Sequence, residues 1–232
     1  TPNMDGLAAN GMLFSRAYCP NPLCVPSRAS IFTGRYPTET GVQTNDQVKD
    51  FLDSEKFPNM GSIFKRAGYA TGFFGKWHMP FPANQTAVHG FDIVRPNKQQ
   101  GGDAGTAAGA SGFIKANRGG PFLAVASFLN PHNICQWPRG EEFSEGDPGT
   151  PPPLNQCPPR RANYGPPKNE TDIMLLMRRS YQATPMFPVG NFDESKWRRY
   201  IWAYYRMIEK VDALVGKVLQ SAGGAVTKLA GC

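Results

Sequence analysis

The feature that most constrains the fold is a helix-like segment followed closely by a short apolar run, a pair that occurs twice. Residues 59–68 place apolar side chains at helical spacing, and residues 69–74 follow as a short apolar run. Residues 106–117 form a weaker helical pattern, and residues 121–129 are again apolar. Helices that alternate with short apolar strands are typical of α/β proteins, so we predict a largely parallel sheet flanked by helices.

Polar side chains follow both predicted strands. Lys76 and His78 come directly after the first strand, and His132 comes after the second. In parallel sheets, ligands gather beyond the carboxyl ends of the strands, so we expect these three side chains to converge near one edge of the sheet. The third histidine, His89, has no such position, and we interpret it as structural.

A separate segment places a thiol where a helix is predicted to begin. Cys24 is followed by Pro26, which is tolerated in the first turn of a helix because no N–H is needed there. Ser27 is predicted to cap this end, and Gly34 to end the helix. Arg28 lies one turn after Cys24, so the thiol and the cation flank the positive end of a helix dipole, which suits an anion.

The rest of the chain divides into a long irregular stretch and a long helix. Residues 12–18 alternate enough to predict a strand. Residues 136–191 hold half of the chain's 22 prolines and are predicted to form a long loop, with a helical turn at 174–179. Residues 193–220 are predicted to form a long amphipathic helix whose apolar stripe packs in a core. The stripe consists of Trp197, Ile201, Tyr204, Ile208, Val211, Val215 and Val218.

Composition excludes several classes of function. The formal net charge of +7 comes with no dense basic run that is interleaved with aromatic residues, so nucleic-acid binding is not predicted. The longest apolar run, residues 122–129, is too short to cross a bilayer. None of the five cysteines forms a Cys-x-x-Cys pair, so a structural zinc site is not predicted, and their disulfide pairing stays open.

Together, these motifs resemble the signature of the type I, formylglycine-dependent sulfatases of the alkaline-phosphatase superfamily. The core of the match is Cys24-Val25-Pro26-Ser27-Arg28, with Thr33-Gly34-Arg35 after it. Residues 1–8 and 14–19 resemble the run that precedes this motif, and the likeness extends in patches to about Leu219. Because the chain opens inside the family's pattern, we expect residues 1–232 to be a partial sulfatase catalytic domain, a fragment with an incomplete sheet.

The resemblance implies a role for each matched residue. Cys24 would be oxidised to formylglycine by a modifying enzyme that reads Pro26 and Arg28, and its hydrated aldehyde would attack sulfur and later expel sulfate. Arg28 would orient this nucleophile, and Lys76 would bind the sulfate. His78 would handle the proton of the nucleophile. His132 would contact the oxygen of the sulfate ester as the leaving-group residue.

The resemblance also implies a calcium ion, with the residue derived from Cys24 among its ligands. Calcium takes six or more oxygen ligands, typically including carboxylates. The family places these acids upstream of Thr1-Pro2-Asn3 and after the long helix, whereas here the last acid is Asp212. We therefore expect most calcium ligands to be absent from this chain. Residues 222–232 do not match the expected strand, and a native tail and a truncation artefact both stay open.

The implied partners are a sulfated small molecule or polysaccharide and the formylglycine-generating enzyme. A secretory, lysosomal or extracellular location is expected. Two alternatives stay open beside the sulfatase interpretation. One is a phosphodiester or phosphonate ester hydrolase of the same superfamily, because both reactions set cations against an anion. The other is an inactive, truncated chain that lacks the metal ligands.

Overall fold

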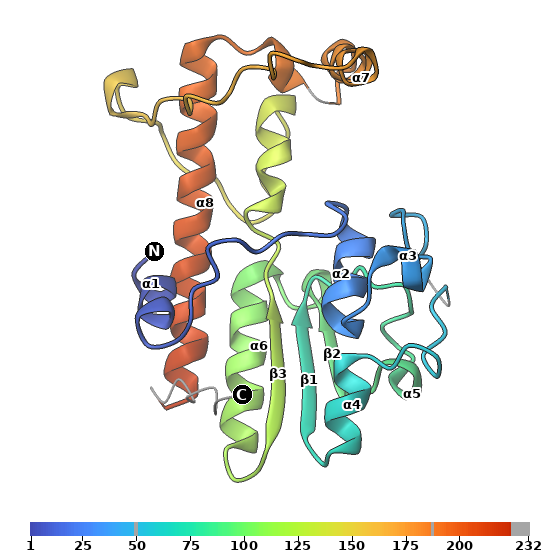
Figure 1. The fold of residues 1–232 in the computed structure, drawn as a ribbon. Coiled ribbons are helices and arrows are strands. Elements are labelled where there is room, and N and C mark those ends of the chain that lie inside the picture. Colours follow the sequence, from blue (N-terminus) through green and yellow to red (C-terminus); the bar gives the residue numbers. More distant parts are fainter. Residues whose placement is uncertain (49–50, 187, 224–232) are drawn as a thin grey trace. The chain divides into compact units, whose positions relative to one another are not determined.

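The computed structural model describes residues 1–48, 51–186 and 188–223, in two compact units. The first unit contains residues 1–128 together with the end of the chain from residue 213, and the second contains residues 129–212. Figure 1 shows the elements of both along the chain.

The first unit is built on a parallel sheet. Its strands are β1 (Ala70–Gly75), β2 (Ile93–Pro96) and β3 (Phe122–Ser127), in the order β2-β1-β3. Gly72 pairs with Ile93 on one side and with Ala124 on the other, and both pairings are parallel. The predicted α/β class is therefore confirmed, and the two predicted strands correspond to β1 and β3.

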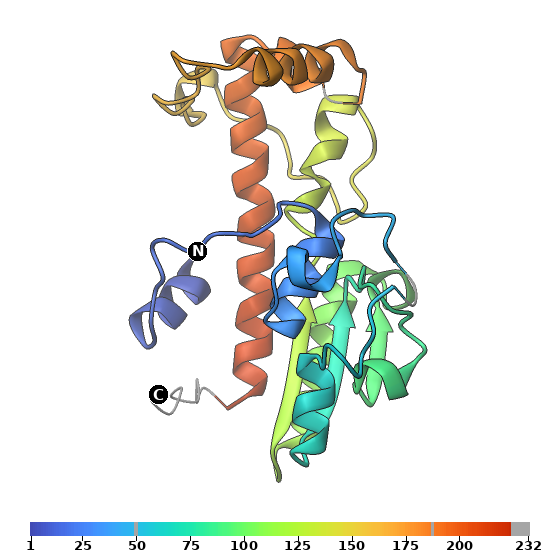
Figure 2. The ribbon, with the colours of Figure 1, turned by 45° about the vertical axis from the view of Figure 1, so that its right-hand side comes forward.

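Helices cover both faces of this sheet. Around it lie α1 (Pro2–Ala9), α2 (Cys24–Thr33), α3 (Pro37–Thr40), α4 (Met60–Arg66), α5 (Thr86–His89), η1 (Asn97–Gln99) and α6 (Gly102–Asn117). Phe73 packs in a cluster with Val25 and Phe32 of α2, whereas Phe74 packs against Phe113 of α6. Successive side chains of a strand point to opposite faces, so β1 is buried on both sides. Figures 1 and 2 show α6 on one side of the sheet and α2 with α4 on the other.

Three sequence predictions for this unit are wrong or incomplete. Residues 12–18 form no strand, and Phe14 and Tyr18 are 72% and 87% exposed. A strand needs a partner for its backbone N–H and C=O groups, and this segment pairs with no strand in the part of the chain that the structure describes. The short edge strand β2 was not predicted, because only four residues pair. β3 is half-buried along its length, not fully buried.

The second unit contains η2 (His132–Arg139), η3 (Leu154–Gln156), α7 (Asp172–Ala183), η4 (Pro188–Asn191) and the first part of α8 (Glu194–Ser221). Irregular segments join these elements, as the proline content predicts. The predicted helical turn at 174–179 is part of a longer helix, α7, which Thr171 caps by accepting a hydrogen bond from the N–H of Met174.

The long helix α8 is confirmed, but its apolar stripe is not wholly core. Ala203 and Met207 are fully buried and pack with Ile134. Trp197, Ile201 and Tyr204, which the stripe places in the core, instead line an open pocket of the second unit. In this part of the helix, the buried positions Ala203 and Met207 each lie one residue before the predicted Tyr204 and Ile208.

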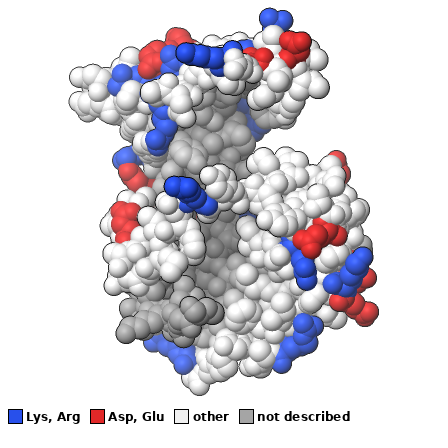
Figure 3. Space-filling view, viewed as in Figure 1, with Lys and Arg blue, Asp and Glu red and all other residues white. Residues whose placement is uncertain are grey.

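On the face drawn in Figure 3, Lys and Arg lie in scattered groups, several of them beside Asp and Glu. No helix of the described residues is long and apolar enough to cross a membrane.

The exit of β1 yields a stability prediction. Gly75 has a φ of +105°, and a Cβ there would lie 2.0 Å from the backbone oxygen of Ser127. Gly75→Ala should lower the free energy of unfolding by about 2–4 kcal/mol, through strain and a clash with backbone. The matched control is Gly112→Ala in α6, where a Cβ meets nothing within 4 Å. The control should gain about 0.5–1 kcal/mol from helix propensity. Urea denaturation measures both, and equal effects would contradict the argument.

Candidate active site

The thiol of Cys24 lies at the first residue of α2. Leu23 is the N-cap residue, and the N–H of Ser27 already donates to the carbonyl of Leu23 at 3.0 Å. The prediction that Ser27 caps this helix is therefore wrong, because its position lies one full turn inside. The helix ends at Gly34, which has a φ of +68°, as predicted.

A shallow pocket opens beside this thiol. It has a volume of about 350 Å³. Its lining residues are Cys19, Pro22, Leu23, Cys24, Ser27, Arg28, Ile31 and Lys76. The Nζ of Lys76 lies 3.5 Å from the Sγ of Cys24, so the lysine that leaves β1 meets the thiol that begins α2. An ammonium and a helix N-terminus on the same pocket favour an anionic ligand.

Arg28 binds the exits of two strands. Its guanidinium donates to the carbonyls of Trp77 at 2.7 Å and Lys76 at 2.6 Å, and to the Oγ of Ser127 at 2.9 Å. Burial lowers the pKa of Arg28 to about 10, and neighbouring Cys24 opposes part of that change. Arg28 therefore stays cationic at neutral pH, and its hydrogen bonds go to the backbone that carries Lys76. The role implied for it, orienting the nucleophile, is not visible in these contacts.

His78 is held in its neutral form beside the two cations of the site. Its φ is +43°, an uncommon value for a residue with a side chain. Its Nδ1 is buried, with no hydrogen-bond partner among the described residues. Burial lowers the pKa of His78, and the nearby cations Lys76 and Arg28 lower it further. The imidazole is therefore held neutral at pH 7.

The structure brings together four of the five predicted site residues: Cys24, Arg28, Lys76 and His78, all in the first unit. The fifth, His132, begins η2 in the second unit. His89 is fully buried, within hydrogen-bond distance of the carbonyl of Ala83 and the N–H of Phe91. This agrees with the structural role predicted for His89.

Two residues of this site were missed by the sequence analysis. Asn45 accepts a hydrogen bond from the N–H of Val25 at 3.0 Å and so satisfies the start of α2 from a distant loop. Ser127 at the end of β3 accepts from Arg28 and donates to the carbonyl of Lys76 at 3.0 Å. Neither carries a local signal: Asn45 lies in a predicted loop, and Ser127 lies inside the strand predicted over residues 121–129.

The residues around Cys24 do not fit a calcium ion. The side chains of the pocket supply two thiols, a hydroxyl and two cations, and no carboxylate. Across the described residues, no group of three or more His, Cys, Asp or Glu side chains could hold a metal ion. This donor set therefore does not fit the calcium-ligand role that the family resemblance implies for Cys24.

The site predicts how stability depends on pH. The pKa of His78 is lowered in the folded state, so unfolding binds protons as the pH falls below about 6.5, the ordinary value. Stability should therefore fall between pH 7 and pH 5. His78→Gln should make the dependence of stability on pH shallower. Lys115→Gln, at an exposed position of α6, should leave it unchanged. Thermal melts at half-unit pH steps measure the slopes, and identical slopes for wild type and His78→Gln would contradict a lowered pKa.

Comparison with known proteins gives a consistent assignment. The family model described as Sulfatase matches residues 1–224. A Delta 4,5-hexuronate-2-O-sulfatase of Bacteroides thetaiotaomicron is 28% identical over 94% of this chain and 46% of its own length. The human N-acetylgalactosamine-6-sulfatase is 39% identical over 40% of this chain and 20% of its own length.

A solved 2-O GAG sulfatase superposes with a TM-score of 0.71 at 26% identity, over 96% of this chain and 49% of that structure. The chain thus spans at most about half the length of these relatives. The family match covers nearly the whole sequence, and the parallel sheet places the matched motif at a cationic pocket. The chain belongs to the sulfatase family.

Proposed function

We propose that the protein carrying this chain is a sulfuric ester hydrolase whose nucleophile derives from Cys24. The observation that carries the proposal is the 3.5 Å contact between the Sγ of Cys24 and the Nζ of Lys76, at a helix N-terminus. Cys24, Pro26 and Arg28 stand at the positions of the family motif. The cationic pocket would hold the anionic sulfate group of the substrate directly over position 24.

Charge explains how this pocket could lower the reaction barrier. A sulfate monoester is anionic and repels nucleophiles until its charge is offset. Lys76 supplies a full positive charge at the pocket, and the first turn of α2 supplies partial positive charge from its N–H groups. Arg28 and Ser127 each donate one hydrogen bond to the carbonyl of Lys76 and so fix that charge near position 24.

Formylglycine at position 24 would supply a hydrated aldehyde, with one hydroxyl to attack sulfur and a second to release sulfate. The thiol fits this conversion because it lines an open pocket and precedes the intact Pro26 and Arg28. Neutral His78, which lies near Lys76 and Arg28, is proposed from the family resemblance to accept the proton of the attacking hydroxyl. His132 is proposed, from the family resemblance, to donate a proton to the leaving oxygen.

The substrate class follows from the relatives. They are named for hexuronate, galactosamine and glycosaminoglycan substrates, all of them sugars. We therefore propose a sulfated saccharide as the substrate of this protein. The formylglycine-generating enzyme is the second proposed partner, because a cysteine does not supply this chemistry by itself.

The first test follows the modification and the turnover together. Co-expression of the full-length protein with the modifying enzyme should lower the mass of the tryptic peptide carrying Cys24 by roughly 18 Da. Cys24→Ser should abolish turnover while the fold is kept, and Lys76→Ala should lower kcat by about 100-fold or more. Sulfate and phosphate esters of one aryl alcohol should be compared. An unmodified thiol, or faster phosphate ester hydrolysis, would contradict the proposal.

The second test concerns this chain by itself. We expect that it neither binds calcium with micromolar affinity nor hydrolyses an aryl sulfate, even with Cys24 converted, because its pocket offers cations and no carboxylate. Calorimetric titration with calcium and an aryl sulfate assay measure both. Micromolar binding together with turnover would show that carboxylates outside the pocket complete the site.

A further inference from the structure

The second unit has a pocket that the proposed catalytic chemistry does not use. It opens between residues 159–164 and α8 and has a volume of about 380 Å³. Its lining residues are Pro159, Arg160, Arg161, Asn163, Tyr164, Trp197, Ile201, Tyr204 and Tyr205. We call it the tyrosine–arginine pocket. All of these residues belong to the second unit.

Three tyrosines keep large faces open to solvent in this pocket. Tyr164, Tyr204 and Tyr205 are 45%, 37% and 39% exposed. Tyr164 meets the ring of Trp197 edge-on, with 5.0 Å between the ring centroids. Trp197 in turn contacts Phe192, which is buried, at 5.9 Å. The exposed aromatic wall is therefore held by a packed cluster, so a flat ligand would meet a surface that is already ordered.

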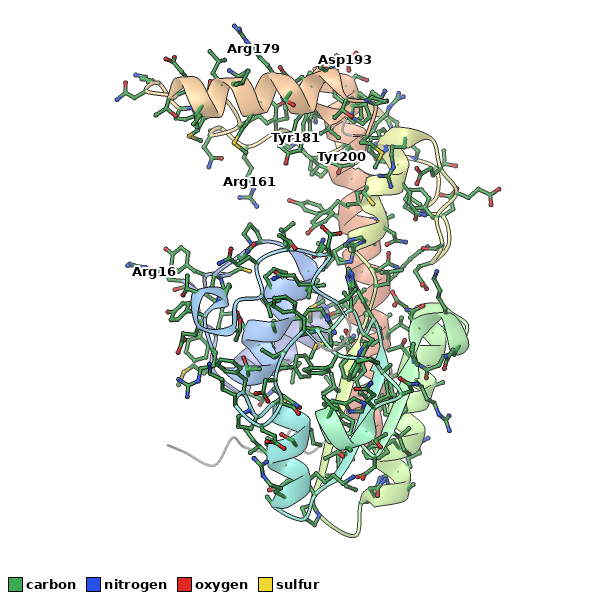
Figure 4. The ribbon with its side chains drawn as sticks, turned by 90° about the vertical axis from the view of Figure 1, so that its right-hand side faces the viewer. Arg16, Arg161, Arg179, Tyr181, Asp193 and Tyr200 are labelled. Atoms are coloured by element: carbon green, nitrogen blue, oxygen red, sulfur yellow. The ribbon has the colours of Figure 1, made fainter. Side chains whose placement is uncertain are left out.

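The charge of the pocket is unbalanced by one residue. Arg160 forms an ion pair with Glu194, and its guanidinium lies 4.4 Å from the centre of the Tyr164 ring. Arg161 is exposed and forms no ion pair with any residue that the structure describes. Figure 4 shows the side chain of Arg161 pointing away from α7. An uncompensated guanidinium beside aromatic faces favours a ligand that carries carboxylate or sulfate groups.

A second hollow continues from the first across Tyr164. It has a volume of about 670 Å³, and Tyr164, Pro166, Pro167 and Tyr181 are among its lining residues. Arg178 there is paired with Glu170 at 2.6 Å, so this part carries little net charge. Because Tyr164 lines both hollows, the surface offers room for a ligand of several linked rings rather than for a single one.

We infer that the tyrosine–arginine pocket binds an extended anionic saccharide, with sugar rings on the tyrosine faces and a sulfate or carboxylate on Arg161. The inference rests on the proposed function in one respect, the choice of a sulfated sugar among anionic ring compounds. Nucleic acid fits poorly, because residues 129–212 contain eleven Lys and Arg against ten Asp and Glu. The pocket would thus bind sugar units of the saccharide other than the one whose sulfate ester is hydrolysed.

The test measures binding of a sulfated heparin tetrasaccharide to this chain by calorimetry at low salt. Arg161→Ala and Tyr204→Ala should each weaken binding about tenfold, which corresponds to about 1.4 kcal/mol. The matched controls are Arg179→Ala on α7 and Tyr36→Ala in the first unit. Figure 4 shows the side chain of Arg179 on the side of α7 opposite to Arg161. Both controls should bind as wild type does. Removing the sulfates from the tetrasaccharide should weaken binding to wild type but change little for Arg161→Ala.

Lys76→Ala separates this inference from the proposed function. That variant removes the ammonium beside Cys24, so unchanged tetrasaccharide binding would place the ligand away from the catalytic pocket. Loss of binding in Lys76→Ala with normal binding in Arg161→Ala would overturn the inference. Equal weakening by Arg161→Ala and Arg179→Ala would overturn it too, since it would indicate a diffuse charge effect. Turnover of an aryl sulfate by the full-length protein tests the proposed function independently.

Discussion

The candidate site depends on one buried cation that is bonded to backbone. Arg28 joins α2 to the exits of β1 and β3 through the carbonyls of Lys76 and Trp77 and the hydroxyl of Ser127. Burying a charge is costly unless hydrogen bonds satisfy it, and these bonds do so without neutralising it. A carboxylate partner would have cancelled the charge. Carbonyl and hydroxyl partners leave a positive potential beside Cys24, which is what an anion-binding pocket requires.

The backbone between Gly75 and His78 determines which side chains reach the site. Both residues have positive φ, so the chain turns sharply where β1 ends. Lys76 then reaches the thiol, while Trp77 returns to the core, where its ring lies 4.8 Å from that of Phe73 and its indole N–H donates to the carbonyl of Phe81. Neighbouring side chains thus take opposite roles, one chemical and one structural. The strain at His78 is held by this packing on either side of it.

The sequence alone could predict the elements that local pattern determines. The two helix–strand pairs, the start of α2 at Cys24 and the long helix α8 follow from spacing, caps and glycines. Residues 12–18 were mispredicted because alternation indicates a strand only when a partner strand exists. Asn45 and Ser127 were missed because their roles arise from contacts across 20 and 99 residues. The apolar stripe of α8 was misplaced because sequence periodicity shows which face of the helix is apolar. It does not show which residues of that face are covered by a neighbouring element.

The positive charge of the pocket also explains why these residues alone would not hold a calcium ion. At an effective dielectric constant of 20, a dication about 4 Å from a single ammonium is repelled by roughly 8 kcal/mol. Arg28 adds a second cation behind Lys76. For a calcium ion to bind beside position 24, carboxylates must first offset the positive charges of Lys76 and Arg28. Further oxygen ligands must then bind the ion itself. The described residues of the pocket supply two cations and no carboxylate, so a metal ion bound there would need carboxylates that this pocket does not supply.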